Sequence, residues 1–348
     1  MKYITFLAGL FGISLTVLMV WQFGFYAILS LIFSVSWGII PIVGFHATQL
    51  ACTAWAWKKI GTTFNHHLSF RYFFLIRSIR EGINDLLPVA QIGGDIIGTR
   101  MVAYRGLSFS QATATVITDL TMELASQVIF IVMGVSLLVL SVKDVSHTGQ
   151  IIDGIGLLLA GICFFVGVQY LGGISLVEKL MIRLAHQHGW SKAEELRGLD
   201  KNIRQIYHRK KNVFLALMAQ FLGWALGTGE VYIILYYMGV PKPLLACFII
   251  ESVGQVVKSA GFVVPGGLGV SEWGLVFVGG VFGLSPQEGI TLSLLKRIRE
   301  IGWGVPSLLL WQWVESKHKA LAPLELTPLM ATKTYEGVCS KNDADDKV

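Results

Sequence analysis

Two acidic residues, Asp95 and Glu272, each follow a stretch of proline and glycine in otherwise apolar sequence. Proline removes a backbone donor and glycine weakens a helix, so neither stretch should form one straight spanning helix. In lipid, broken backbone persists only where protein or a water-filled cavity covers it, and a carboxylate there is costly. The two acids therefore predict a buried polar site that handles a charged group or relays protons. The competing interpretation is that each acid is a structural partner of a neighbouring Arg or Lys.

The sequence near these acids supplies further groups that could hold an anionic lipid head group, since an Arg can grip a phosphate through two parallel hydrogen bonds. Asn84 and Gln91 could bind head-group oxygens or simply satisfy loose backbone, and Lys296 could instead form a salt bridge with Glu300 along one helix. The predicted substrate-binding residues are Asn84, Gln91, Gly93, Gly94, Asp95, Arg100, Pro265, Gly266, Gly267, Glu272, Lys296, Arg297 and Arg299.

Three further acids are candidates for a proton relay. Asp119 and Glu123 are four residues apart and so share one helix face, and Glu300 follows the basic run that ends at Arg299. His66 and His67 are read as a loop pair, and the sequence has no phosphate-loop, nucleophile-elbow or metal-protease motif. We therefore expect no metal, no cofactor and no ATP-driven pump; a downhill or proton-coupled path fits better.

The elements that must position these groups form an internal repeat. Three residue pairs share one and the same offset along the chain: Pro88 with Pro265, Asp95 with Glu272, and Glu123 with Glu300. A Gly-Leu-Ser triplet follows the same offset. Because such self-similarity in one ungapped register indicates repeated architecture, each copy should contain one helix break, at Pro88 in the first and at Pro265 in the second.

Composition places these repeats in a membrane. Of the 348 residues, 53% are hydrophobic and 14% are charged, whereas soluble domains carry about 25% charged residues. The net charge of +6 is read as cytoplasmic anchoring by Lys and Arg, not as nucleic-acid binding. Four cysteines lack metal or redox spacing. The fold class is therefore an all-α polytopic integral membrane protein.

We expect about six full spans, each of roughly 20 residues or more, and two broken, re-entrant segments. The broken segments are Glu81–Arg105 and Leu244–Ser285, and the stretch Lys58–Arg80 before them should be a basic cytoplasmic connection. The expected spans are Met1–Trp21, Phe25–Trp57 with a tilt or a kink at Pro41, a helix capped by Ser108 or Ser110 that runs to about Val142, Ile152–Leu171, Val213–Met238 and Gln287–Trp313.

Charge sets the expected orientation and domain limits. An excess of Lys and Arg places the loop 172–212 in the cytoplasm, where its amphipathic helices would lie on the anionic leaflet. Both termini should be cytoplasmic. The repeats then enter from opposite sides and are inverted, which is typical of transporters. The expected transmembrane domain is 1–319, with repeat one at about 1–142 and repeat two at about 151–314, followed by a disordered tail at 320–348.

The residues of both breaks resemble those of a known family. Arg80–Pro88 followed by Gly93-Gly94-Asp95, and Pro265–Gly269 followed by Glu272, resemble the flippase-like transmembrane domain of lysylphosphatidylglycerol synthases. The resemblance runs from about Tyr3 to Trp313. The runs LLPVAQIGGDIIGTR and DLTMELASQ are especially similar to hopanoid-biosynthesis-associated membrane proteins of that family.

The resemblance implies lipid translocation, or a role in hopanoid or other polyprenoid lipid handling, in the inner (cytoplasmic) membrane of a bacterium. With no room for a soluble aminoacyltransferase domain, we expect no synthase activity. From the positions of the shared motifs, the resemblance implies a functional role for Asn84, Pro88, Gly93, Gly94, Asp95, Pro265, Gly266, Gly267 and Glu272.

The function expected from the sequence is that of a lipid transporter or flippase whose substrate is a membrane lipid, not that of an enzyme. One alternative is a lipid-modifying membrane enzyme that uses Asp95 or Glu272 as acid or base. Another is a non-catalytic partner of lipid-synthesis enzymes that binds them through the basic loop. No nucleic-acid partner is expected, and the oligomeric state, the lipid and the direction of transport stay open.

Overall fold

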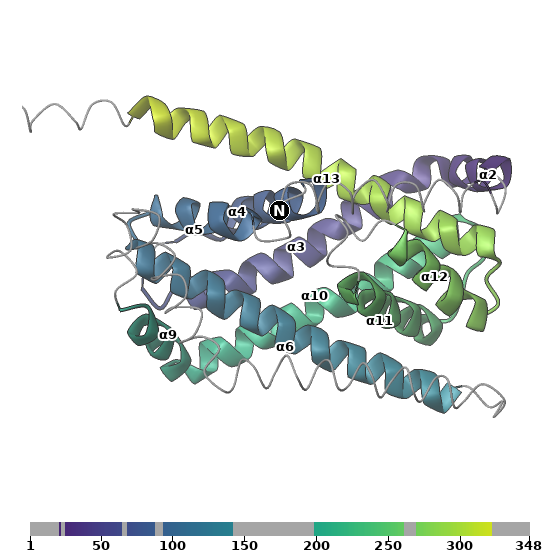
Figure 1. Cartoon of the computed structure of the whole chain (residues 1–348), viewed down its shortest axis with the longest axis horizontal. Coiled ribbons are helices and arrows are strands. Elements are labelled where there is room, and N and C mark those ends of the chain that lie inside the picture. Colours follow the sequence, from purple (N-terminus) through teal and green to yellow (C-terminus); the bar gives the residue numbers. More distant parts are fainter. Residues whose placement is uncertain are drawn as a thin grey trace, which may run out of the picture. The chain divides into compact units, whose positions relative to one another are not determined.

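The computed structural model describes residues 21, 25–64, 68–87, 93–141, 198–260 and 269–321, which form helices and contain no strand (Figure 1). Three helical stretches among them are long and apolar enough to cross a membrane: Tyr26–Gly61, Phe109–Ser141 and Lys210–Tyr237. The all-α membrane fold is therefore confirmed. The spans expected at Met1–Trp21 and Ile152–Leu171 lie outside the described residues, as does the tail beyond 321.

The chain divides into two compact units, Met1–Ser307 and Leu308–Val348. The described part of the second unit is the C-terminal end of one helix, α13. Every contact discussed below lies within the first unit.

The first long apolar stretch is interrupted near its middle. Helix α2 (Phe25–Val35) is followed by a 3₁₀ turn (Ser36–Gly38) and then by α3 (Ile39–Gly61). We expected a tilt or a kink at Pro41, but the break falls at Ser36, whose φ is 43°. Pro41 instead lies in the first turn of α3, where its missing N–H leaves no intrahelical bond unmade.

The two broken segments have matching helix boundaries. The first comprises α4 (Phe70–Leu86) and α5 (Gly93–Ala103), followed by α6 (Phe109–Ser141); the second comprises α11 (Leu244–Ala260) and α12 (Val270–Val281), followed by α13 (Pro286–Leu321). The starts of α5 and α12 are separated by the same offset along the chain as the starts of α6 and α13. These boundaries fit the repeat, while its inversion in the membrane stays a prediction. Pro88, Gln91 and Pro265–Gly267 lie outside the described residues.

The helices that follow the breaks begin with the same local device. Ser108 Oγ accepts from the N–H of Gln111 at 3.2 Å, and the Gln111 side chain accepts from the N–H of Ser108 at 3.1 Å. Ser285 and Glu288, at the equivalent positions of the second repeat, make the same reciprocal pair at 3.3 and 2.7 Å. These are capping boxes, which satisfy two of the N–H groups that a helix start leaves unpaired.

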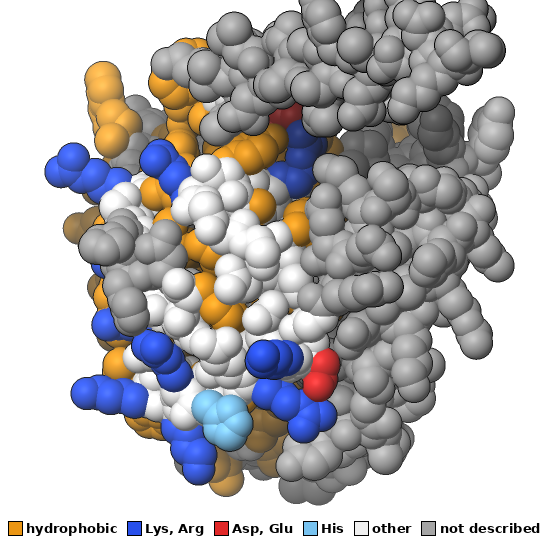
Figure 2. Space-filling model, turned by 90° about the vertical axis from the view of Figure 1, so that its left-hand side faces the viewer, with side chains coloured by type: hydrophobic (Ala, Val, Ile, Leu, Met, Phe, Trp, Pro, Cys, Tyr) orange, Lys and Arg blue, Asp and Glu red, His pale blue; other side chains and the backbone are white. Residues whose placement is uncertain are grey.

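The amphipathic helix α9 (Leu199–His208) does not lie with its apolar face on the lipid leaflet as we expected. Leu199, Ile203 and Ile206 are buried, in a cluster with residues of α3, α6 and α10 (Lys210–Tyr237). The apolar stripe of α9 therefore covers the ends of the longer helices. Lys and Arg side chains gather on this side of the molecule (Figure 2), and the exposed bases of this region are Lys201, Arg204, Arg209, Lys210 and Lys211.

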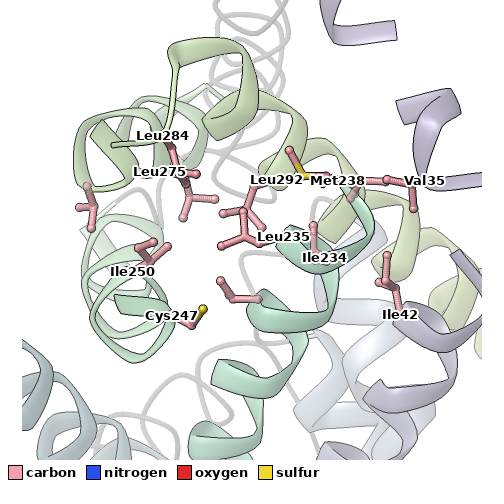
Figure 3. Close-up of a cluster of buried hydrophobic side chains, with 13 residues drawn as sticks. Val35, Ile42, Ile234, Leu235, Met238, Cys247, Ile250, Leu275, Leu284 and Leu292 are labelled. Carbon is pink, nitrogen blue, oxygen red and sulfur yellow. The ribbon is translucent and has the colours of Figure 1, made fainter. Parts of the chain in front are cut away.

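Helix α10 packs along α3, α6 and α11, which places it at the centre of the bundle. One apolar core joins α10 to the second broken segment and to the break between α2 and α3 (Figure 3). Its labelled members are Val35, Ile42, Ile234, Leu235, Met238, Cys247, Ile250, Leu275, Leu284 and Leu292. This core fixes the faces that α11, α12 and α13 turn toward α10, and so it decides which charged side chains meet.

Candidate functional site

Five charged side chains from α4, α5 and α6 form a first ion-pair cluster: Arg77, Arg80, Asp95, Asp119 and Glu123. Arg77 binds Glu123 with both terminal nitrogens, at 2.6 and 3.0 Å. Arg80 reaches three acids: its Nε lies 2.5 Å from Asp95, its Nη1 2.6 Å from Asp119 and its Nη2 3.2 Å from Glu123. Three carboxylates thus share two guanidinium groups.

Helical spacing places these groups together. Arg77 and Arg80 are three residues apart on α4, and Asp119 and Glu123 are four apart on α6, so each pair occupies one helix face. Asp95 is the third residue of α5, where the N-terminal end of the helix dipole favours a carboxylate. From α10, the amide of Gln220 donates to Asp119 at 2.8 Å.

A second ion-pair cluster draws on α3, α4 and α10 to α13. Its members are His46, Glu81, Asp85, Glu230, Lys258, Glu272, Arg297, Arg299 and Glu300. At its centre, Arg299 Nε lies 3.2 Å from Glu230 Oε1 and its Nη1 lies 3.7 Å from Glu81 Oε1. His46 lies between these two acids, and both His46 and Glu230 are almost fully buried.

Lys258 and Arg297 pair with the remaining acids of the second cluster. Lys258 Nζ donates to Glu300 at 3.0 Å and lies 3.9 Å from Asp85. Arg297 Nε donates to Oε1 of Glu272, a fully buried side chain, at 2.8 Å. Glu272 is the third residue of α12, as Asp95 is of α5, so both acids sit in the first turn of the helix after a break.

Lys296 does not pair with Glu300, the partner that helical spacing along α13 allowed. Its ammonium group instead binds Glu251 of α11, which also accepts from Gln255 at 2.7 Å. Glu300 is turned toward Lys258, because the packing of α11 on this side brings that longer-range partner close. The Lys296–Glu300 salt bridge, which we considered as the alternative to head-group binding, is therefore absent.

A small cavity of about 10 Å³ lies beside the second cluster. This volume corresponds to about one water molecule. Its lining combines the apolar Leu50 and Trp303 with polar and charged side chains, which are Ser78, Glu81, Asp85, Arg299 and Glu300.

The predicted residues around the first break have different surroundings. Asn84 accepts from the N–H of Gly94 at 2.9 Å and so satisfies backbone at the start of α5, one of the two roles we considered. Gly94 packs so closely that a Cβ atom there would overlap the carbonyl oxygen of Arg80. Arg100 is exposed and donates to the hydroxyl of Tyr104 at 3.2 Å. Gly93 is the first residue of α5.

Sequence reasoning missed several members of the two clusters. We read Lys58–Arg80 as a basic connection, but α4 begins at Phe70 and buries both Arg77 and Arg80. The cluster members absent from the predicted site residues are His46, Arg77, Arg80, Glu81, Asp85, Glu230 and Lys258. A usable signal was present, because Ile76, Ile79 and Ile83 have helical spacing and mark α4 as a partly buried helix.

Carboxylates outnumber permanent cations in both clusters. The first has three carboxylates and two guanidinium groups. The second has five carboxylates facing Lys258, Arg297, Arg299 and the titratable His46. In the described part of the chain, no group of His, Cys, Asp and Glu has the arrangement of a metal site. The excess carboxylates can therefore accept a proton. A charged group that enters either cluster can also replace one partner of an existing ion pair.

The chain matches a known family over most of its length. The family model described as "Lysylphosphatidylglycerol synthase TM region" matches residues 5–305, a range that contains both ion-pair clusters. No curated protein and no solved structure matches the chain.

Proposed function

The chain belongs to the family of the lysylphosphatidylglycerol synthase TM region, and from this premise we propose that it moves a polar or anionic membrane lipid between the two leaflets. Membership supports the coarser statement that this is a membrane protein of lipid synthesis or transport. The proposal adds the translocation step, and a link to hopanoid or other polyprenoid lipid metabolism.

The observation that carries the proposal is the pair of buried ion-pair clusters in a chain with apolar spanning helices. Ionisable groups inside a membrane are costly and are found where ions, protons or substrates pass. A lipid head group that crosses needs groups that replace its water, while its tails stay in hydrocarbon. Arg297 and Arg299 can offer donors to a phosphate, and Asp95 and Glu272 can release their Arg partners for it.

We place the protein in the bacterial inner membrane with both termini in the cytoplasm. The exposed bases of α9 and of the start of α10 support this orientation, because Lys and Arg are enriched on cytoplasmic segments.

The test is a lipid-leaflet assay in proteoliposomes. Fluorescently labelled phosphatidylglycerol, phosphatidylethanolamine and a polyprenyl phosphate are offered, and the fraction that reaches the far leaflet is followed by quenching. Glu272→Gln should reduce this fraction per folded protein, because the buried pair with Arg297 is lost. Asp200→Asn, an exposed acid of α9, is the matched control and should leave transport unchanged.

Two outcomes would contradict the proposal. No movement of any offered lipid by the wild type would remove translocation as the function. Chemical conversion of an offered lipid, detected by mass spectrometry of the vesicles, would favour a membrane enzyme instead.

A further inference from the structure

One histidine, His46, connects four helices through a single ring. From α3, its Nε2 lies 2.7 Å from Oε1 of Glu81 on α4 and 3.3 Å from Nη1 of Arg299 on α13. Its Nδ1 lies 3.8 Å from Oε2 of Glu230 on α10. The ring also meets the edge of Trp303, with 6.0 Å between centroids, and His46 is only 4% exposed.

The short contact with Glu81 assigns one proton of the ring. At 2.7 Å from a carboxylate, Nε2 donates and so carries hydrogen, and the longer 3.3 Å contact with Arg299 Nη1, which can only donate, is then not a hydrogen bond. A neutral ring then has its lone pair on Nδ1. That atom is buried and has no hydrogen-bond partner among the contacts of the described residues. Leaving a buried polar atom without a hydrogen bond costs about 1–3 kcal/mol, and a protonated Nδ1, 3.8 Å from Glu230, would carry the same cost, so this contact alone does not separate the neutral from the charged ring.

A second proton on the ring, on Nδ1, would face the carboxylate of Glu230. Glu230, the group nearest Nδ1, is held by Gln49 at 2.7 Å and by Arg299 at 3.2 Å. With neutral His46, two carboxylates, Glu81 and Glu230, face one guanidinium group, that of Arg299. Protonation of His46 brings the summed charge of His46, Glu81, Glu230 and Arg299 to zero.

Water can approach the ring from the α4 side. The side chain of Glu81 is 28% exposed, although its Oε1 touches the buried imidazole. The water-sized cavity beside Glu81 continues this polar region toward the other charged groups nearby, which are Asp85 on α4, Lys258 on α11 and Glu300 on α13. Glu81 is thus the partly exposed group that contacts the buried ring.

We propose that His46 is a proton-binding site, and that its protonation state sets the rate at which the chain moves lipid. This inference rests on the proposed function and names its regulation. The protonated ring links α3, α4, α10 and α13 through Glu81 and Glu230, whereas the neutral ring releases the link to Glu230. Translocation needs these helices to rearrange, so it should be slow at acid pH and faster as pH rises. An ordinary imidazole titrates between about pH 5 and 8, which sets the range to test.

The experiment repeats the leaflet assay between about pH 5.5 and 8.5 with wild type, His46→Gln and His208→Gln. Glutamine can still donate to Glu81 but does not titrate, and His208 is an exposed residue of α9. The wild-type rate should rise about tenfold across the range, within the usual span of coupling between sites. His46→Gln should flatten this rise, and His208→Gln should keep it. An unchanged pH profile in His46→Gln overturns the proposal.

A second measurement is independent of transport and of whether His46→Gln folds. Histidine-labelled wild type in nanodiscs is titrated by NMR, and the His46 signal is assigned by its response to Glu81→Gln. That variant removes the carboxylate that faces Nε2, so the titration midpoint of His46 should change. A His46 signal that does not titrate between about pH 5 and 8 overturns the proposal.

Different results would contradict lipid translocation and its control by His46. Wild type that moves lipid at the same rate at every pH contradicts the role of His46 alone. Wild type that moves no lipid at any pH contradicts the proposed function and, with it, the coupling.

Discussion

Arg297 Nε donates to Glu272 Oε1 at 2.8 Å, and this carboxylate is fully buried in the first turn of the helix after the second break. The corresponding acid of the first repeat, Asp95, pairs with Arg80 instead. Arg80 precedes its acid and lies on α4, whereas Arg297 follows its acid and lies on α13. The two broken segments therefore share the position of the acid in the first turn of a helix, but the Arg that pairs with it comes from a different helix in each.

The Glu272–Arg297 pair should show strong energetic coupling. Either Glu272→Gln or Arg297→Gln leaves one charge without its main partner, and we expect a loss of about 3 kcal/mol of stability from each. The double variant should lose clearly less than the sum, because it leaves neither charge behind. Unfolding in detergent at increasing denaturant measures this cycle. Additive losses would show that the two side chains do not interact.

Arg80 should be the most sensitive base of the first cluster. Its guanidinium group pairs with Asp95, Asp119 and Glu123, so Arg80→Met leaves Asp95 without its Arg partner and leaves Arg77 as the one guanidinium group for the other two acids. We expect a cost of about 3–5 kcal/mol. Arg204, which is 75% exposed in its ion pair with Asp200, is the control. Arg204→Met should cost less than about 1 kcal/mol. Equal thermal stability of the two variants in detergent would contradict the buried position of Arg80.

Gly94 should not tolerate a side chain. Ala at this position places Cβ against the carbonyl oxygen of Arg80, a backbone atom that cannot move aside alone. We expect a loss of about 1–3 kcal/mol from the forced separation of α4 and α5. Gly44→Ala in α3 is the control, since nothing lies within 4 Å of its Cβ, and helix propensity favours Ala there by about 1 kcal/mol. Thermal unfolding of both variants measures the difference, and a stable Gly94→Ala would disprove the close approach.

The two capping boxes should make comparable contributions. Ser108→Ala and Ser285→Ala each remove an acceptor for an N–H at a helix start, and each should cost about 1 kcal/mol. Ser136→Ala is the control, because the exposed hydroxyl of Ser136 donates to the carbonyl of Val132 within the same helix. A change of less than about 0.5 kcal/mol is expected there. Hydrogen exchange at Gln111 and Glu288 should increase in the matching variant, and unchanged protection would contradict the caps.

Local chemistry decided much of the fold. Apolar composition and the low charge content are enough to predict an all-α membrane protein. The helix starts after Ser108 and Ser285 follow from capping, which depends on residues within one turn. The constant offset that relates Asp95 to Glu272 also predicts where α5 and α12 begin. The sequence predicted a tilt of this span or a kink at Pro41, but the helix is interrupted at Ser36, because a proline in the first turn of a helix breaks no hydrogen bond.

Tertiary structure alone decided which charges meet. Helical spacing allowed Lys296 to pair with Glu300 on its own helix. Lys296 instead pairs with Glu251 of α11, and Glu300 pairs with Lys258 of the same helix. His46 had no sequence signal at all, because its partners Glu81 and Glu230 lie on other helices, far along the chain. The rotation and spacing of each helix set such pairs, and these come from the packing of apolar cores over long sequence separations. Periodicity along one helix gives the face on which a charge lies, but not the neighbour toward which packing turns that face.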